Sequence, residues 1–176
     1  STALDVFKQG DVVQSDWNQS QVWSDGSITT GAVSSPVENM FDGDYDTNCM
    51  PSTEVAVFTF GTPVPVKSTV RMYITASLAW TGFKINGTSV TPSTGLGKQW
   101  VDMTQYFTAN NWTTFDSFTF GIKSGVYAQY VFAIEVDGKL LVNSGITDPN
   151  AVKVVSVDAD NNQMTVDGDE WKDWNQ

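Results

Sequence analysis

The 176-residue sequence contains no histidine and a single cysteine, Cys49. Without histidine the chain cannot form a Ser-His-Asp or Cys-His nucleophile pair, an HExxH zinc helix or an imidazole proton shuttle. One cysteine cannot form an internal disulfide. Cys49 is therefore a buried small hydrophobe, a free thiol or an intermolecular contact, and its residue type favours the buried hydrophobe.

Basic residues and long apolar runs are also scarce. Nine Lys and Arg stand against 20 Asp and Glu, for a net charge of −11, which disfavours binding to nucleic acid and to anionic membranes. The apolar run of residues 126–136 is interrupted by Gln129 and Glu135 and falls short of the roughly 20 residues that span a bilayer. We expect neither nucleic-acid partners nor membrane insertion. The sequence shows no signal-peptide pattern, and its abrupt ends predict a fragment of a longer polypeptide.

The sequence is rich in residues that favour strands, and no segment of 11 to 18 residues keeps the apolar spacing of a helix. Apolar and polar residues alternate instead in residues 69–75, 117–122 and 131–136. In the last of these, the bulkier set Phe132, Ile134 and Val136 is expected to face the core. Alternation of this kind is typical of a strand with one buried face.

Turn signals separate the predicted strands. Asn-Gly at 86–87 and Asp-Gly at 137–138 and 167–168 favour the positive φ angles of tight hairpins. A further hairpin is predicted between residues 152–157 and 163–166. Many short strands without helical crossovers predict an all-β fold, an antiparallel β-sandwich or jelly roll.

Changes in composition suggest three segments. We expect a β-sandwich domain at residues 34–148, an N-terminal β segment at 1–33 and a C-terminal β-hairpin segment at 149–176. Each flank is too small to hold a core alone, so the flanks are expected to pack on each other or on neighbouring modules.

Two short motifs carry a resemblance to a known family. The FDGD string at residues 41–44, within Glu38 to Thr47, and the stretch at 133–138 resemble the opening loop and closing strand of galactose-binding-like, discoidin-type β-sandwich domains. The order of motifs up to the tail at 154–171 is similar to modules of virion proteins from marine tailed phages (cyanophages). This resemblance implies a virion location, in an external appendage, fibre or tail, with other virion proteins or further copies of the chain as partners. Homotrimers are common in that family.

Three aspartates in the first motif, Asp42, Asp44 and Asp46, have a spacing that can surround one hard cation. The resemblance adds Glu135, because a structural calcium often lies where this loop meets the last strand of such domains. The alternative is that these aspartates cap turns, as Asp commonly does in loops. No cofactor is required by either interpretation.

Exposed aromatic residues suggest carbohydrate binding, because a ring stacks on the apolar face of a sugar. The candidate ligand-binding residues are Trp80, Trp112, Tyr127 and Tyr130, which lie in or beside predicted loops. For each of them, packing in a core or interface is the competing explanation.

Two functions remain open, and both are non-enzymatic. The first is a structural module of a phage appendage, fibre or tail protein. The alternative is an adhesin module that binds host surface polysaccharide or a receptor, with avidity from many copies. A glycosidase pair such as Asp42 and Asp44, or Asp102 and Asp116, is disfavoured because most acidic residues lie in turn contexts.

Overall fold

The computed structural model describes residues 8–13, 15–76, 82–92, 97–123, 127–161, 163–166 and 171–173. Strands account for 47% of these described residues, which confirms the predicted all-β class. Within the described ranges there is one α-helix, α1 (Thr104–Asn110), whose seven residues are too few to show a helical apolar pattern in the sequence. Two short 3₁₀ helices lie at Trp23–Asp25 and Val37–Met40. No helix in these ranges is long and apolar enough to span a bilayer.

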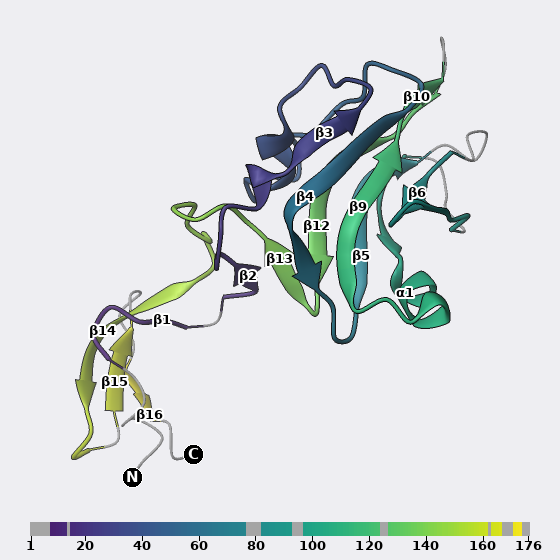
Figure 1. The fold of residues 1–176 in the computed structure, drawn as a ribbon. Helices are drawn as coiled ribbons and strands as arrows, with labels where there is room; N and C mark the ends of the chain where they lie inside the picture. Colours follow the sequence, from purple (N-terminus) through teal and green to yellow (C-terminus); the bar gives the residue numbers. More distant parts are fainter. Residues whose placement is uncertain are drawn as a thin grey trace. The chain divides into compact units, whose positions relative to one another are not determined.

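Two five-stranded sheets form the larger part of the fold (Figure 1). The first sheet has the order β2 (Trp17–Asn18), β13 (Lys139–Leu141), β12 (Tyr130–Val136), β5 (Val70–Ala76) and β8 (Gly97–Asp102). The second has the order β3 (Ser27–Thr30), β4 (Ala56–Pro65), β9 (Thr114–Phe120), β6 (Lys84–Ile85) and β7 (Thr88–Ser89). All neighbours are antiparallel except β13 and β2, which are parallel. A small hairpin joins β10 (Ile122–Lys123) to β11 (Tyr127–Ala128).

The main core lies between these two sheets, so the fold is a β-sandwich. Strand β5 buries Val70, Met72 and Ile74, the alternate residues that the sequence pattern indicates. The other sheet contributes a row of phenylalanines, with the rings of Phe58 and Phe118 centred 5.4 Å apart. Aromatic rings at this separation attract one another beyond the effect of burial alone.

The predicted core face of β12 is wrong at Phe132. The register between β12 and β5 shifts between Val131 and Ala133, which marks a β-bulge. A bulge places one extra residue in the strand and reverses the alternation from that point. Val131 therefore joins the main core, whereas the ring of Phe132 lies 5.8 Å from that of Tyr73 on the opposite face of the sheet. The prediction holds for Ile134 and Val136.

A separate small unit combines the described parts of residues 1–16 and 147–176. Its sheet has the order β1 (Val12–Val13), β14 (Val152–Asp158), β15 (Gln163–Val166) and β16 (Trp171–Asp173). Its own core consists of Val154, Met164 and Val166. Strands from before and after the sandwich therefore pair with each other in one sheet, β1 with β14.

The larger unit spans residues 17–146, so its first boundary differs from the expected residue 34. The polar segment before residue 34 supplies two edge strands of the sandwich, β2 and β3. An edge strand needs only a small apolar contribution because one side faces solvent. The polar composition of the segment before residue 34 therefore resembled that of a separate flank.

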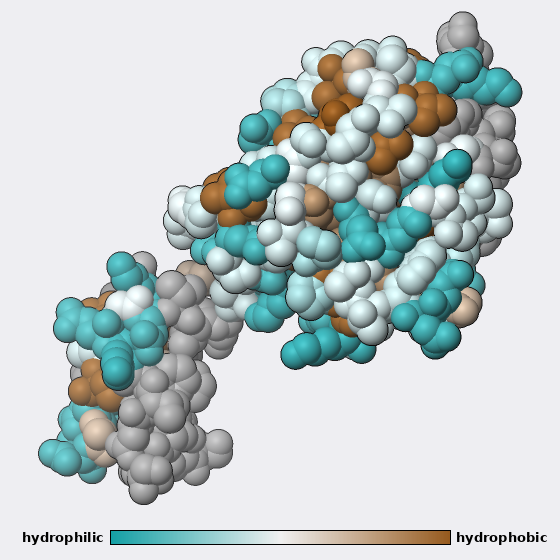
Figure 2. Space-filling model, in the orientation of Figure 1, coloured by the Kyte–Doolittle hydropathy of each residue, from teal (hydrophilic) through white to brown (hydrophobic). Residues whose placement is uncertain are grey.

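In the view of Figure 1 the sheet that contains β4 and β9 lies in front of β5 and β12. Figure 2 shows that hydrophobic and hydrophilic residues are interspersed on this front face of the sandwich. Val22 and Val55 are 38% and 47% exposed. Such scattered apolar residues are ordinary for a protein surface and indicate no docking site.

Candidate functional site

Of the four residues predicted to bind a ligand, the structure describes the surroundings of two. Trp80 and the side chain of Tyr127 lie outside the described part of the chain, although the backbone of Tyr127 belongs to β11. Tyr130 begins β12, opposite Thr75 of β5, and is half-buried. Trp112 follows α1 and lines an open groove. These residues therefore do not form one described site.

We call the surface around Trp112 the Trp112 groove. It has a volume of about 320 Å³, near the lower end of the range for small-ligand pockets. Its lining contains three apolar residues and five polar ones: Val66, Phe107 and Trp112, with Lys67, Ser68, Thr108, Asn111 and Thr113. A ring, three hydroxyl groups and an amide in one open groove suit a ligand with both apolar and hydroxyl-bearing faces.

The end of α1 forms one wall of the groove. Asn111 has the left-handed φ of 53° that commonly ends a helix, and its N–H donates to the carbonyl groups of Phe107 and Thr108. The N–H of Trp112 donates to the Phe107 carbonyl at 3.0 Å. The indole of Trp112 packs at 83° to the buried ring of Phe107, with centroids 5.5 Å apart. The position of the indole is thus fixed by both backbone and ring contacts.

The opposite wall is the loop between β4 and β5, and Asp137 holds it in place. The Asp137 carboxylate accepts hydrogen bonds from the backbone N–H groups of Lys67, Ser68 and Thr69 at 2.7 to 3.1 Å, and from the Ser68 hydroxyl. Partial burial raises the pKa of Asp137, but these hydrogen bonds outweigh it and lower the pKa below the usual value. The Val66 N–H donates to the Thr113 carbonyl at 2.9 Å and joins the two walls.

The aspartate loop that was predicted to bind calcium is held by its own side chains. Asp42 Oδ1 accepts from the N–H of Asp44, and Asp44 Oδ1 accepts from the N–H of Asp46, at 2.9 and 2.8 Å. The hydroxyl of Thr47 donates to Asp42 Oδ2 at 2.5 Å. These hydrogen bonds form successive Asx turns, so the aspartates cap turns, as the alternative to calcium binding expected.

Gly43 allows this loop to lie close to the sheet. It has a φ of +73°, and a Cβ at this position would lie 2.6 Å from the indole of Trp17. Only glycine avoids both the backbone strain and the collision. The glycine of the FDGD string is thereby explained by local packing.

The same loop places Tyr45 over the outer face of the first sheet. We call the cluster of Tyr45, Tyr73, Trp100 and Phe132 the aromatic face. Tyr73 and Trp100 are cross-strand partners with ring centroids 5.1 Å apart, and Tyr45, which is 43% exposed, packs at 5.3 and 5.9 Å from them. No local sequence pattern indicates this cluster, because its members come from a loop and three strands that are distant in sequence.

Two ion pairs lie beside the aromatic face. Glu135, a predicted calcium ligand, accepts two hydrogen bonds from Arg71 at 2.6 and 2.8 Å. Asp46, another predicted ligand, pairs with Lys98 at 2.9 Å. The guanidinium of Arg71 lies 4.6 Å from the ring centroid of Trp100, and the ammonium of Lys98 lies 4.5 Å from that of Phe132. These two pairs place two positive and two negative side chains beside the aromatic face.

Among the described residues no group of three or more His, Cys, Asp or Glu is arranged to hold a metal ion. Glu135 and Asp46 pair with different cations, on Arg71 and Lys98. Calcium binding remains a prediction.

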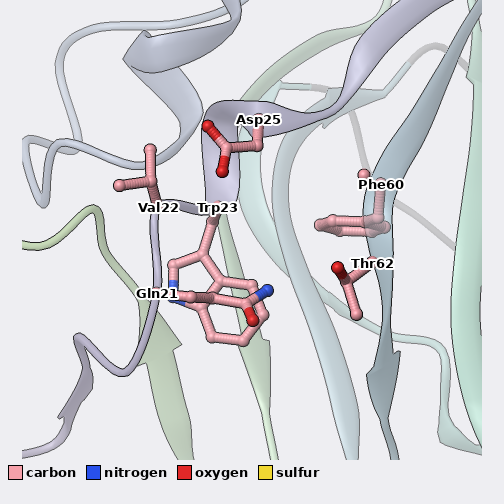
Figure 3. A pocket seen from close by; sticks show the side chains of 7 residues that line it. Gln21, Val22, Trp23, Asp25, Phe60 and Thr62 are labelled. Atoms are coloured by element: carbon pink, nitrogen blue, oxygen red, sulfur yellow. The ribbon is translucent and has the colours of Figure 1, made fainter.

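A smaller pocket lies beside Trp23 (Figure 3). Figure 3 shows the rings of Trp23 and Phe60 on opposite sides of this pocket, with Asp25 near its upper edge. Its volume is about 50 Å³, room for one or a few water molecules rather than a sugar. The indole N–H of Trp23 donates to the Asn18 carbonyl at 2.8 Å, so this tryptophan is a packed residue.

The sequence indicated Trp112, but it indicated neither Lys67 as a lining residue of the groove nor Asp137 as the residue that holds one of its walls. The Asp-Gly dipeptide at Asp137 did mark a hairpin, but nothing in the local sequence linked that hairpin to residues 67–69.

The chain matches no family model, no curated protein and no solved structure. The resemblance to galactose-binding-like domains and to phage modules accordingly remains a prediction.

Proposed function

We propose that this chain is a non-enzymatic glycan-binding module that binds a polysaccharide in the Trp112 groove. The observation that carries the proposal is the combination of an indole and polar side chains in one open groove of about 320 Å³. A sugar ring has apolar C–H faces that stack on an indole and hydroxyl groups that bond to Asn, Ser and Thr.

The two fixed walls support the same proposal. Asp137 holds the wall that contains Lys67 and Ser68, and the end of α1 holds Trp112. A binding site that is already ordered loses less entropy when the ligand binds. A shallow groove of this kind gives a modest affinity for each site, which many copies on one particle raise through avidity.

The resemblance in the sequence would place such a module on the external appendage or tail of a virion, with a host surface polysaccharide as the ligand. Under this proposal the chain is an adhesin module. A protein receptor on the host surface is the alternative ligand for the same surface.

The second candidate is a structural module of the appendage, and the aromatic face favours it. Tyr, Trp and Arg are enriched at protein interfaces, and three of these side chains, Tyr45, Trp100 and Arg71, lie together on this face. Under this proposal the face contacts a neighbouring virion protein or another copy of the chain, which includes the homotrimer implied by the resemblance.

One set of variants distinguishes the two proposals. We would measure binding of the purified chain to a panel of bacterial surface polysaccharides, with calcium and then with a chelator, and would measure its mass by sedimentation. Trp112→Ala should reduce polysaccharide binding at least tenfold, because stacking of a ring on a sugar contributes on the order of 1.5 kcal/mol. Trp112→Phe should retain part of the affinity.

Tyr45→Ser is the matched control, because it removes an exposed aromatic residue outside the groove. A glycan-binding module keeps its affinity in Tyr45→Ser and loses it in Trp112→Ala, with both variants folded by circular dichroism. Loss of self-association in Tyr45→Ser, with no polysaccharide bound by the original chain, would support the structural module and contradict the glycan proposal.

A further inference from the structure

The Trp112 groove contains one charged lining residue, Lys67, in a chain whose net charge is −11. Its side chain makes no ion pair with another described residue. A single ammonium group in a groove would ordinarily attract an anionic ligand such as a uronic acid. The charges around Lys67 decide whether it does so here.

The carboxylate of Asp137 lies directly behind this wall. It accepts a hydrogen bond from the Lys67 N–H at 3.0 Å and further bonds from the next two amides, of Ser68 and Thr69. Consecutive N–H groups that point to one spot form an anion-binding nest. In this protein the nest is already filled by the protein's own carboxylate.

We infer that the Trp112 groove takes uncharged sugar residues, and that Asp137 sets this selectivity because it fills the nest and offsets the charge of Lys67. The inference rests on the proposed function, since it assumes that the groove binds a glycan. An acidic sugar in the groove would find the three amides already used. It would also face a nearby carboxylate and an acidic protein surface.

The magnitude follows from the distance between the charges. The Lys67 amide is bonded to Asp137, and a lysine side chain is about 6 Å long, so its ammonium lies within roughly 10 Å of the carboxylate. That separation is close to the Debye length of about 8 Å at physiological ionic strength, so the carboxylate still acts on the groove while more distant charges are screened. Removal of one such charge should change the preference between neutral and acidic sugars about fivefold.

The experiment uses oligosaccharides that differ only in charge. Oligomers of mannose and mannuronic acid, and of galactose and galacturonic acid, matched in length, would be titrated into the full chain by calorimetry. The original chain should bind the neutral member of a pair at least tenfold more tightly. The Asp137→Asn variant keeps one oxygen acceptor and tolerates the left-handed φ of 54° at this position, so it should remain folded. In this variant the preference for the neutral sugar should fall about fivefold.

Two further variants separate a local effect from a change in net charge. Glu54→Gln removes one negative charge from an exposed residue that does not line the groove, and it should leave the preference unchanged. Lys67→Gln should weaken binding of the acidic sugar further. The preference of the original chain should also shrink between 0.05 and 0.5 M salt, to about the value of Asp137→Asn.

Each result has a definite meaning. Acidic oligomers that bind the original chain as tightly as neutral ones would overturn the inference and leave the proposed function intact, provided that Trp112→Ala abolishes that binding. An unchanged preference in folded Asp137→Asn would overturn the role of Asp137. Absence of binding to every oligomer and to the polysaccharide panel would overturn the proposed function together with the inference.

Discussion

Replacement of Asp137 by alanine should destabilise the chain by about 2 kcal/mol at pH 7. The carboxylate accepts bonds from three backbone N–H groups and one hydroxyl. A hydrogen bond to a charged group contributes about 1.5 to 3 kcal/mol, so three amides could give about 5 kcal/mol. We halve this figure because Lys67, Ser68 and Thr69 are exposed and can bond to water when the carboxylate is absent.

The direction of the Asp137 pKa shift determines how the stability difference between the original chain and Asp137→Ala should change with pH. The pKa of Asp137 in the folded chain is lowered, so the carboxylate contributes stability above its unfolded pKa of about 3.9. That contribution is lost as the pH falls through the lower folded value. The difference between the original chain and Asp137→Ala should therefore be full at pH 7 and should shrink below about pH 4.

Urea unfolding followed by tryptophan fluorescence would measure the effect. With a slope of about 2 kcal/mol per molar urea, the midpoint of Asp137→Ala should be about 1 M lower than that of the original chain. Asp116→Ala is the matched control, because Asp116 accepts one hydroxyl bond, from Thr114, and is exposed. It should change the stability by less than 0.5 kcal/mol, since surface substitutions usually have small effects. Equal stability of Asp137→Ala and the original chain at pH 7, or a difference that persists unchanged at pH 2, would refute the reasoning.

Two further predictions concern the loop and the core. Gly43→Ala should lower the free energy of unfolding, measured by thermal denaturation, by about 2 to 3 kcal/mol, because it adds the strain of a positive φ to a collision with Trp17. Gly87 has a φ of +76° but open space around it, so Gly87→Ala should cost about 1 kcal/mol, and similar losses for both variants would contradict the packing of the loop. The thiol of Cys49 is fully buried, and this burial, with a contribution from the charge of Glu38, raises the pKa of the thiol to about 12. A thiol reagent at pH 8 should therefore modify Cys49 only in denaturant. Rapid modification of the native chain would contradict this prediction and show that the core around Cys49 opens.

The sequence predicted what depends on neighbours along the chain. The hairpin at 137–138 joins β12 to β13 as expected, and the Asn-Gly turn at 86–87 joins β6 to β7. Cys49 is the buried residue that its type suggested. The predicted Asp-Gly turn at 167–168 lies outside the described residues. Each of these features rests on a few consecutive residues, whose φ preferences or apolarity are properties of the local sequence.

Features that depend on pairing between distant strands were not predictable in the same way. Alternation places Phe132 in the core only if β12 keeps its register, and the bulge beside Ala133 breaks that condition. The aromatic face needs β5 and β8 to align Tyr73 with Trp100 and the aspartate loop to bring Tyr45 over them. A single sequence does not contain those registers.

The Trp112 groove depends both on local sequence and on the pairing of distant strands, which explains why the sequence indicated one of its residues and not the others. Trp112 stands out because it is an aromatic residue among the polar residues of a predicted loop, a local pattern. Asp137 acts on Lys67 across 70 positions of sequence, through hydrogen bonds that exist only once β5 and β12 have paired. The antiparallel pair sets the end of β12 beside the start of β5, Val136 opposite Val70, so the hairpin that follows β12 necessarily meets the loop that precedes β5. One register therefore fixes both the stability of the hairpin and the shape and charge of the groove, which is why substitutions at Asp137 should alter unfolding and sugar selectivity together.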